Sequence, residues 1–347
     1  MTLSDRIEAF SFLGELLRDA ITGKKTRFSS RIDQLIETQH IINPWFTPDN
    51  VRMALRAIAG ELTTENLTKW CSAYPGLDSE IRQVNVCVVM AGNIPLAGFH
   101  DFLSVLISGN RISARTSSKD PDLIKLITDI LISFNPEFEK MIFLTDGRIS
   151  DFDMVIATGS DNSSRYFEYY FDKYPHIIRK NRNSIAIIDG TESKDEIRAL
   201  GTDVFSYFGL GCRNVSKLYL PIGYDIARIT GLWEQYTELI NHNKYSNNYD
   251  FYKAVYLVNK EIFTDTGYLI LKESYELSSP VSVLYYTFYN SAGDLNNETG
   301  LLKDKIQCIT GHEHIPFGKA QVPVLWDYAD GIDTLEFLSK KNYQGIL

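Results

Sequence analysis

Apolar residues recur with two different spacings along this chain. Over residues 3–70 they return every three or four positions, as on one face of an α-helix. From residue 84 onward, short apolar runs such as VNVCVVM (84–90) and DMVIATG (153–159) alternate with longer helical stretches. Strands that alternate with helices favour right-handed crossovers and a parallel sheet covered on both faces. The pattern therefore predicts an α/β protein that begins with a helical segment.

The pattern shifts again near residue 190, which predicts a second α/β domain. We place the first domain at 1–190, the second at 191–319, and a closing segment at about 320–347 that returns to the first as a strand and a short helix. In the second domain the pattern predicts helices over 194–209 and 225–240 and an Asn-rich loop over 241–252. The strands expected there are 253–263, 267–274 and 281–289.

Composition excludes several classes of protein. The chain has 347 residues, 44% of them hydrophobic, and a net charge of −9, which argues against a nucleic-acid partner. No apolar run approaches the ~18 residues that span a bilayer, and the amphipathic, acid-containing N-terminus does not resemble a secretory signal. Four widely spaced cysteines without a CxxC pair predict neither disulfides nor structural zinc. We therefore expect a cytoplasmic protein without a membrane span.

The segment YFGLGCRNVSKLYLP (207–221) places Cys212 in a glycine-rich corner before a strand-like run. Flexible glycines allow a substrate and neighbouring backbone N–H groups to approach the sulfur, as a nucleophilic cysteine requires. The alternative is a small buried side chain at a strand edge. A dinucleotide-binding fingerprint is not the explanation, because Asn214 stands where its third glycine should be.

Other common motifs are missing or incomplete. TGKKT (22–26) lacks the upstream glycine of a phosphate-binding loop, and there is no GxSxG. His312 and His314 in GHEH offer two ligands without a visible third, so a polar loop is favoured and no metal is predicted. The tyrosines of 224–290 are expected in the core rather than along an acyl tunnel.

Four segments in order resemble the aldehyde dehydrogenase superfamily, and most of all its acyl-CoA reductase branch, which contains the fatty-acid reductase component of bacterial bioluminescence. They are VVMAGNIPLAGFHDFL (88–103), SGNRISARTSS (108–118), ATGS (157–160) and GLGCRN (209–214), the last followed by KESYELSSP (272–280). The late stretch IPFGKAQVPVLWDYADGIDTLEFL (315–338) resembles this branch in particular. The resemblance runs from about residue 80 to the end of the chain.

The resemblance implies which residues carry the chemistry. Cys212 takes the place of the superfamily's nucleophile. Asn93 takes the place of the asparagine whose amide helps to form the oxyanion hole; its alternative role is that of a turn residue before Pro95. A neutral amide suits an oxyanion hole because it donates a hydrogen bond without acting as a competing acid.

The resemblance also implies a nicotinamide cofactor. Arg115 and Thr116 stand where the superfamily has a Lys-Pro that contacts the adenosine ribose, and a guanidinium without a nearby acid favours the 2′-phosphate of NADPH. A surface arginine is the alternative. Gly159 and Ser160 would open a helix near the cofactor phosphates, and Glu276 would hold the nicotinamide ribose.

One departure from the superfamily bears on the reaction. Members that hydrolyse their acyl-enzyme carry a glutamate base where this chain has Ile178, Arg179 or a neighbour, and no acid stands in that stretch. Without a base to activate water, transfer of the acyl group to and from a thiol is favoured over hydrolysis. His176 is an alternative acid–base group.

Together these inferences predict an aldehyde dehydrogenase-like α/β fold of two doubly wound domains with the active site between them. The expected activity is NADPH-dependent reduction of a fatty acyl-CoA or acyl-protein thioester to the aldehyde through a thioacyl-Cys212 intermediate. The alternatives are a cysteine-dependent acyltransferase or thioesterase without a redox cofactor, and a non-catalytic subunit of a fatty-acid reductase complex. We expect a homo-oligomer that associates through IRQVNV (81–86) and the last ~20 residues.

Overall fold

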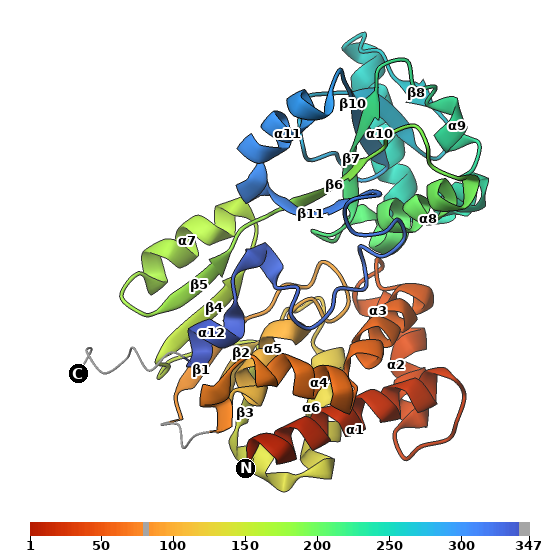
Figure 1. The fold of residues 1–347 in the computed structure, drawn as a ribbon. Helices are drawn as coiled ribbons and strands as arrows, with labels where there is room; N and C mark the ends of the chain where they lie inside the picture. The colour runs from red at the N-terminus through yellow and green to blue at the C-terminus, as the bar shows by residue number, and fades with distance from the viewer. Residues whose placement is uncertain (79–82, 340–347) are drawn as a thin grey trace. The chain divides into compact units, whose positions relative to one another are not determined.

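The computed structural model describes residues 1–78 and 83–339 (Figure 1). The last eight residues and part of IRQVNV, to which oligomer contacts were assigned, lie outside these ranges. The chain forms two compact units, Met1–Lys180 with the part from Val324 onward, and Asn181–Pro323. The boundary expected at residue 190 lies later than the observed one, because the strand β6 (Asn183–Ile187) hydrogen-bonds within the second sheet.

The N-terminal segment is helical, as its apolar spacing predicts. Three of its four helices begin at a threonine whose hydroxyl accepts a backbone N–H of the first turn: Thr2, Thr47 and Thr63. The helices are α1 (Leu3–Ile21), α2 (Ser29–Ile42), α3 (Pro48–Glu61) and α4 (Thr64–Ser72).

The first unit contains a five-stranded parallel sheet in the order β3-β2-β1-β4-β5. The chain builds β1, β2 and β3 outward in one direction and then returns to β4 on the other side of β1. The strand order therefore reverses between β1 and β4, which is where open α/β sheets bind ligands, at the carboxyl ends of the strands. The strands are β1 (Asn85–Val89), β2 (Arg111–Arg115), β3 (Ile142–Thr145), β4 (Met154–Thr158) and β5 (His176–Arg179), with helices α5 (Phe99–Ile107), α6 (Asp122–Phe134) and α7 (Asp161–Phe171).

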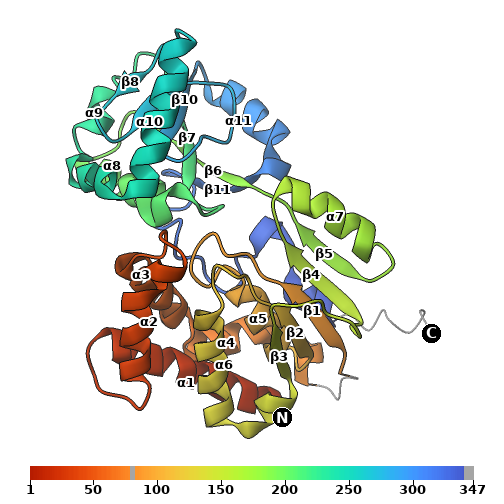
Figure 2. The same ribbon diagram turned by 180° about the vertical axis from the view of Figure 1, so that it is seen from behind.

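Alternation along β1 assigns the two faces of this sheet. Val86 and Val88 point into the larger core with α1, α5 and α6, whereas Cys87 points to the other face, where Phe167 and Phe171 of α7 pack. Figure 2 shows α7 beside β4 and β5. The segment from Val324 onward joins the larger core through Leu325 and through the short helix α12 (Thr334–Ser339). Helix α12 matches the predicted closing helix, but the described residues 324–333, where a return strand was predicted, form turns and a short 3-10 helix instead.

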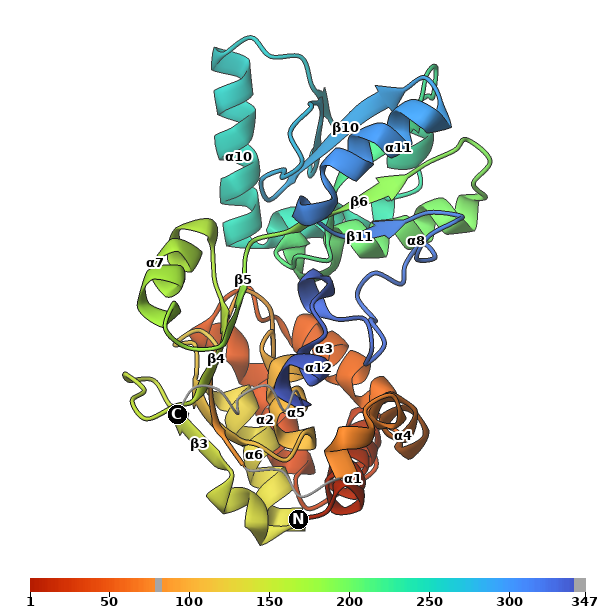
Figure 3. The same cartoon turned by 60° about the vertical axis from the view of Figure 1, so that its left-hand side comes forward.

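The second unit contains a six-stranded sheet in the order β11-β6-β7-β10-β9-β8, parallel except for β8. Leu218 and Leu220 of β7 pack with α8, whereas Tyr219 points to the opposite face with α11. Figure 3 shows α8 and α11 beside the strands of this unit. Besides β6, the strands are β7 (Val215–Pro221), β8 (Thr264–Asp265), β9 (Ile270–Glu273), β10 (Val283–Tyr289) and β11 (Ile306–Thr310), with helices α8 (Lys194–Phe205), α9 (Ala227–Thr230), α10 (Asn243–Val258) and α11 (Ala292–Leu301).

The loop expected over 241–252 and the strand expected over 253–263 are wrong, because α10 occupies most of both ranges. Its buried side chains, Tyr245, Tyr249 and Tyr256, are spaced by four and seven residues and so lie on one helical face. Packing of Tyr249 and Tyr256 against β9 and β10 outweighs the weak helix propensity of the asparagines. Among the described helices, none is both long enough and apolar enough to cross a membrane.

Candidate functional site

Cys212 lies on a sharply folded turn between α8 and β7. The three residues Tyr207, Phe208 and Gly209 all have positive φ, at 51°, 57° and 77°. The left-handed conformation costs a non-glycine residue about 1–2 kcal/mol, and here the side chains of Tyr207 and Phe208 are buried, which holds it in place. The turn brings Cys212 to an exposed position, while Cys71, Cys87 and Cys308 are buried.

The residues around Cys212 anchor this turn to the rest of its unit. Asn214, which is 3% exposed, accepts a hydrogen bond from the Gly211 N–H at 2.8 Å and donates from Nδ2 to the carbonyls of Asp203 and Ser206 at 3.0 and 2.8 Å. On the other side, the Ser184 hydroxyl donates to the Cys212 carbonyl at 2.9 Å. The backbone that presents the thiol is therefore fixed from both α8 and β6.

Asn93 lies in the loop after β1, at the carboxyl edge of the first sheet, and its side chain is exposed. Three residues later Leu96 has φ 57°, and its N–H donates to a carboxylate oxygen of Asp120 at 2.7 Å. Burial raises the pKa of Asp120 to about 7, against the opposing effect of the hydrogen bond from Leu96. Asp120 thus shapes the loop that carries Asn93.

The proposed cofactor residues of the first unit gather at the same edge. Arg115 is the last residue of β2, and it is paired across the sheet with Val89, the last residue of β1. Thr116 follows it and donates its N–H to the Thr145 carbonyl at 2.9 Å, which continues the pairing toward β3. The Arg115 side chain is exposed.

Gly159 and Ser160 connect β4 to α7 at this edge. The hydroxyl of Ser160 accepts the Ser163 N–H and caps the helix, which leaves other first-turn N–H groups without an intrahelical partner. A Cβ on Gly159 would lie 2.8 Å from both Phe167 and Ser163, so only glycine allows α7 to pack this closely. A capped helix start and an exposed arginine at the same edge of the sheet suit a phosphorylated dinucleotide.

Glu276 lies in the second unit, in the connection from β9 to β10, and its side chain is exposed. Its N–H donates to the Ser274 hydroxyl at 3.1 Å. The structure therefore brings Asn93, Arg115, Thr116, Gly159 and Ser160 to one edge of the first sheet, and it places Cys212 and Glu276 in the second unit.

Arg179, one of the residues that by the resemblance stand at or next to the place of the missing glutamate base, has a structural role. Arg179 is buried and donates to the carboxylate of Asp101 at 2.7 and 3.3 Å, and also to the Ala329 carbonyl and the Thr334 hydroxyl. An acid thus does lie beside this position in space, but it is engaged by a guanidinium. His176, the alternative acid–base group, has its Nδ1 2.8 Å from the Tyr174 carbonyl.

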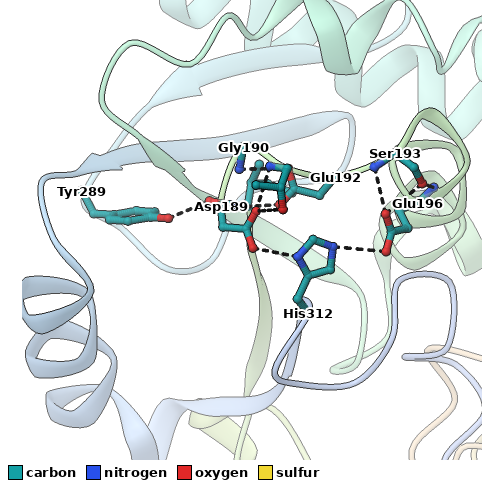
Figure 4. Close-up of polar contacts among 9 residues, drawn as sticks. Asp189, Gly190, Glu192, Ser193, Glu196, Tyr289 and His312 are labelled. Atoms are coloured by element: carbon teal, nitrogen blue, oxygen red, sulfur yellow. Dashed lines mark hydrogen bonds and ion pairs between the residues drawn. The ribbon is translucent and has the colours of Figure 1, made fainter.

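The GHEH motif forms part of a polar cluster that sequence reasoning did not find (Figure 4). His312 Nδ1 lies 2.7 Å from an oxygen of Asp189, and Nε2 lies 3.1 Å from an oxygen of Glu196. Both oxygens of Glu192 accept backbone N–H groups, from Asp189 and Gly190. Asp189, Glu192 and His312 offer donor atoms within 4.8 Å of one another, the types that a cation prefers. Their existing hydrogen bonds account for the arrangement as an imidazole held between carboxylates.

Comparisons with known proteins agree with the motifs. No family model matches the chain. The chain is similar to aldehyde dehydrogenase 21 of Physcomitrella patens in complex with succinate (TM-score 0.65, 12% identity, 98% of this chain and 84% of that one). It is also similar to the Mycobacterium tuberculosis aldehyde dehydrogenase complexed with NAD+ (TM-score 0.62, 13% identity, 93% and 77%). The chain has the aldehyde dehydrogenase fold. The predicted fold class is thereby confirmed.

A curated sequence relative points to the same branch as the motifs. It is the long-chain acyl-protein thioester reductase of Aliivibrio fischeri, 25% identical over 195 residues. The matched region spans 50% of this chain and 40% of the relative. The resemblance to the acyl reductase branch of the aldehyde dehydrogenases is confirmed by this relative together with the fold.

Proposed function

We propose that the chain is an aldehyde-forming acyl thioester reductase that uses Cys212 as its nucleophile and a nicotinamide dinucleotide as reductant. One observation carries the proposal: the turn that holds Cys212 is strained and anchored, and it exposes this thiol while the other three cysteines are buried. An exposed sulfur on a fixed backbone is what nucleophilic attack on a carbonyl requires. The aldehyde dehydrogenase fold and the thioester reductase relative support the reaction class.

In the first step, the Cys212 thiolate attacks the carbonyl carbon of the thioester. A bond forms between Sγ and that carbon, and the bond from the carbon to the leaving thiolate breaks once the oxyanion collapses; the leaving sulfur takes up a proton. Asn93, by the resemblance, donates its amide N–H to the oxyanion, with the Cys212 backbone N–H as a second donor. The acyl group then stays on Cys212 as a thioester.

In the second step, reduction releases the aldehyde. When bound, a reduced nicotinamide would supply the hydride, two electrons and a hydrogen, that the thioacyl carbon on Cys212 accepts. The resulting hemithioacetal oxyanion on Cys212 collapses: its oxygen re-forms the carbonyl, the carbon–sulfur bond breaks, and the aldehyde and the Cys212 thiolate are released. Arg115, Thr116, Gly159 and Ser160 hold the dinucleotide in this proposal, and Glu276 holds its nicotinamide ribose. The exposed guanidinium of Arg115 favours NADPH.

The neighbourhood of Arg179 supports reduction over hydrolysis. Asp101, the acid that lies beside it, is engaged in an ion pair with a buried arginine and is not available as a base for water. We therefore expect that the acyl-enzyme persists when no reductant is present.

The deciding experiment follows the acyl group on the protein. Incubation with a long-chain acyl-CoA should add one acyl mass to the intact wild type, at Cys212 by peptide mapping, and NADPH should then release the aldehyde. Cys212→Ala should show neither event, whereas the control Cys71→Ala, at a buried thiol, should show both. Acylation and turnover to free acid without any nucleotide binding would select an acyltransferase or thioesterase instead. No adduct under any condition would select a non-catalytic subunit.

A further inference from the structure

The connection from β9 to β10 carries Glu276 and is held by side chains of the sheet beneath it. Because β9 and β10 are parallel, residues 274–282 must return along the sheet to the start of β10. Three backbone carbonyls of this connection accept hydrogen bonds from residues of β7 and β10: Ser274 from the Thr287 hydroxyl at 2.7 Å, Tyr275 from Lys217 Nζ at 3.1 Å, and Leu277 from the Ser216 hydroxyl at 2.8 Å. These bonds bracket Glu276 on both sides.

A β-bulge changes the direction of the Ser216 side chain, one of the three side chains that donate to this connection. The register between β6 and β7 shifts between Ser184 and Ile185, which pair with Val215 and Lys217, so Ser216 is the extra residue. A bulge re-aims the side chains around it. Ser216 and Lys217 can therefore both reach the carbonyls of the same connection, although neighbours on a regular strand point to opposite faces.

Lys217 is the charged anchor, and its burial is complete. The side chain is 0% exposed, with Nζ 3.7 Å from an oxygen of Glu298 and 4.8 Å from the centre of the Tyr219 ring. Burial lowers the pKa of Lys217, while the carboxylates of Glu298 and Glu276 act in the opposite direction. Placing an ammonium in the interior is costly unless its bonds are satisfied, and the carbonyl next to Glu276 supplies one of those bonds.

We propose that Lys217 is a positioning residue for Glu276, and that it fixes the carboxylate through the Tyr275 carbonyl and through its charge. The proposal rests on the proposed function, in which Glu276 holds the nicotinamide ribose. Lys217 itself does not touch the cofactor. Its removal therefore weakens nucleotide binding and leaves transfer of the acyl group to Cys212 intact.

The test compares Lys217→Met with Lys272→Met. Lys272 lies on β9 in the same row of the sheet, because Tyr285 of β10 pairs with Lys217 on one side and with Lys272 on the other. Lys272 is also partly buried and paired with a glutamate, Glu261, but its ammonium does not contact the carbonyls that flank Glu276. Lys272→Met is therefore a matched control, because it also removes one lysine side chain from the same sheet.

We expect Lys217→Met to weaken NADPH binding at least fivefold by fluorescence titration and to raise the nucleotide KM more than it lowers kcat. Acylation of Cys212 without nucleotide should stay within twofold of the wild type. Lys272→Met should change neither NADPH binding nor acylation by more than twofold, even if it lowers the Tm as much as Lys217→Met does. NADPH binding by Lys217→Met within twofold of the wild type would overturn the proposal and leave the proposed function standing. Failure of the wild type to bind any nicotinamide dinucleotide would overturn both.

A second variant keeps the test open if Lys217→Met does not fold. The double variant Ser216→Ala with Thr287→Val removes the two neutral anchors and introduces no buried charge. It should weaken NADPH binding two- to fivefold with acylation unchanged. An affinity equal to that of the wild type would show that the anchored connection does not govern Glu276, and would overturn the proposal.

Discussion

Asn214 and Gly211 form a reciprocal pair of hydrogen bonds across the turn that holds Cys212. The Gly211 N–H donates to Asn214 Oδ1 at 2.8 Å, and the Asn214 N–H donates back to the Gly211 carbonyl at 3.0 Å. The same side chain that breaks the glycine pattern of a dinucleotide fingerprint therefore closes the loop around the nucleophile. A glycine at position 214 could not form the side-chain bond.

Replacement of this side chain should loosen the turn. Asn214→Ala leaves the buried carbonyls of Asp203 and Ser206 without their donor, so we expect a loss of about 2–4 kcal/mol in the free energy of unfolding. Urea denaturation measures this loss. Asn259→Ala, at the end of α10, is the control and should stay within about 0.5 kcal/mol of the wild type. A similarly small effect of Asn214→Ala would contradict the anchoring role.

The four thiols should differ sharply in reactivity. Burial raises the pKa of Cys71 to about 11 and that of Cys87 to about 12, so at pH 8 only about one Cys71 in a thousand is a thiolate. Cys308 is also buried, whereas Cys212 is exposed. Brief treatment of the native protein with iodoacetamide should add one carbamidomethyl group, at Cys212, as measured by mass spectrometry. In urea all four cysteines should react. Native labelling of a buried cysteine before Cys212 would refute the assignment.

Arg115 should decide between the two nicotinamide dinucleotides. If its guanidinium binds a 2′-phosphate, Arg115→Gln removes a charged hydrogen bond worth about 1.5–3 kcal/mol and raises the KM for NADPH about 10- to 150-fold. The KM for NADH should change less than twofold. Arg111→Gln is the matched control, since Arg111 is exposed at the opposite end of the same strand. Equal effects of Arg115→Gln on both cofactors would exclude a role in selectivity.

Much of the fold follows from the sequence pattern alone. Strands β1 and β4, which lie side by side in the first sheet, are compact apolar runs, and buried parallel strands have that composition. Helix α10 could not be predicted, because Tyr, Val and Phe favour strands and asparagine disfavours helices, so its stability comes from packing on β9 and β10. Strand β11 interleaves polar Gln307 with apolar residues and gives too short a signal to separate from a loop.

Like the fold, the candidate site has parts that the sequence reveals and parts that it does not. The glycine corner around Cys212 is a local signal and could be identified in the sequence. Its supports are not local. Asp120 binds an N–H 24 residues away, and Lys217 binds a carbonyl 58 residues away. No spacing rule links such partners, because only the crossovers of the sheets bring them together.

His312 should make the stability of its unit depend on pH. The hydrogen bond with Asp189 raises the pKa of His312 above its ordinary value of 6.5, with Glu196 and Glu192 acting in the same direction. A raised folded-state pKa stabilises the protein fully below about pH 6.5, and this contribution is lost as the pH rises through the folded value. The Tm of the wild type should therefore exceed that of His312→Gln by about 1–3 °C at pH 6. The two should converge by about pH 9, and a constant difference across this range would exclude the imidazolium.

Asp120 should also make the protein less stable as the pH rises, but through the cost of burying its ionised form. Its folded-state pKa of about 7 lies above the ordinary 3.8, chiefly because the carboxyl is buried, so the folded protein holds this proton more tightly than the unfolded chain does. The free energy of unfolding therefore falls as the pH rises from about 4 to 7. Asp120→Asn keeps an oxygen for the Leu96 N–H but cannot ionise. At pH 8 we expect it to be more stable than the wild type by on the order of 1–3 kcal/mol in urea denaturation, and to match it near pH 4.

Asp146→Asn, at an exposed aspartate, should leave the pH profile unchanged. If Asp120→Asn also follows the wild-type profile, then Asp120 is ionised at little cost, and its carboxylate is a permanent charge beside the loop of Asn93.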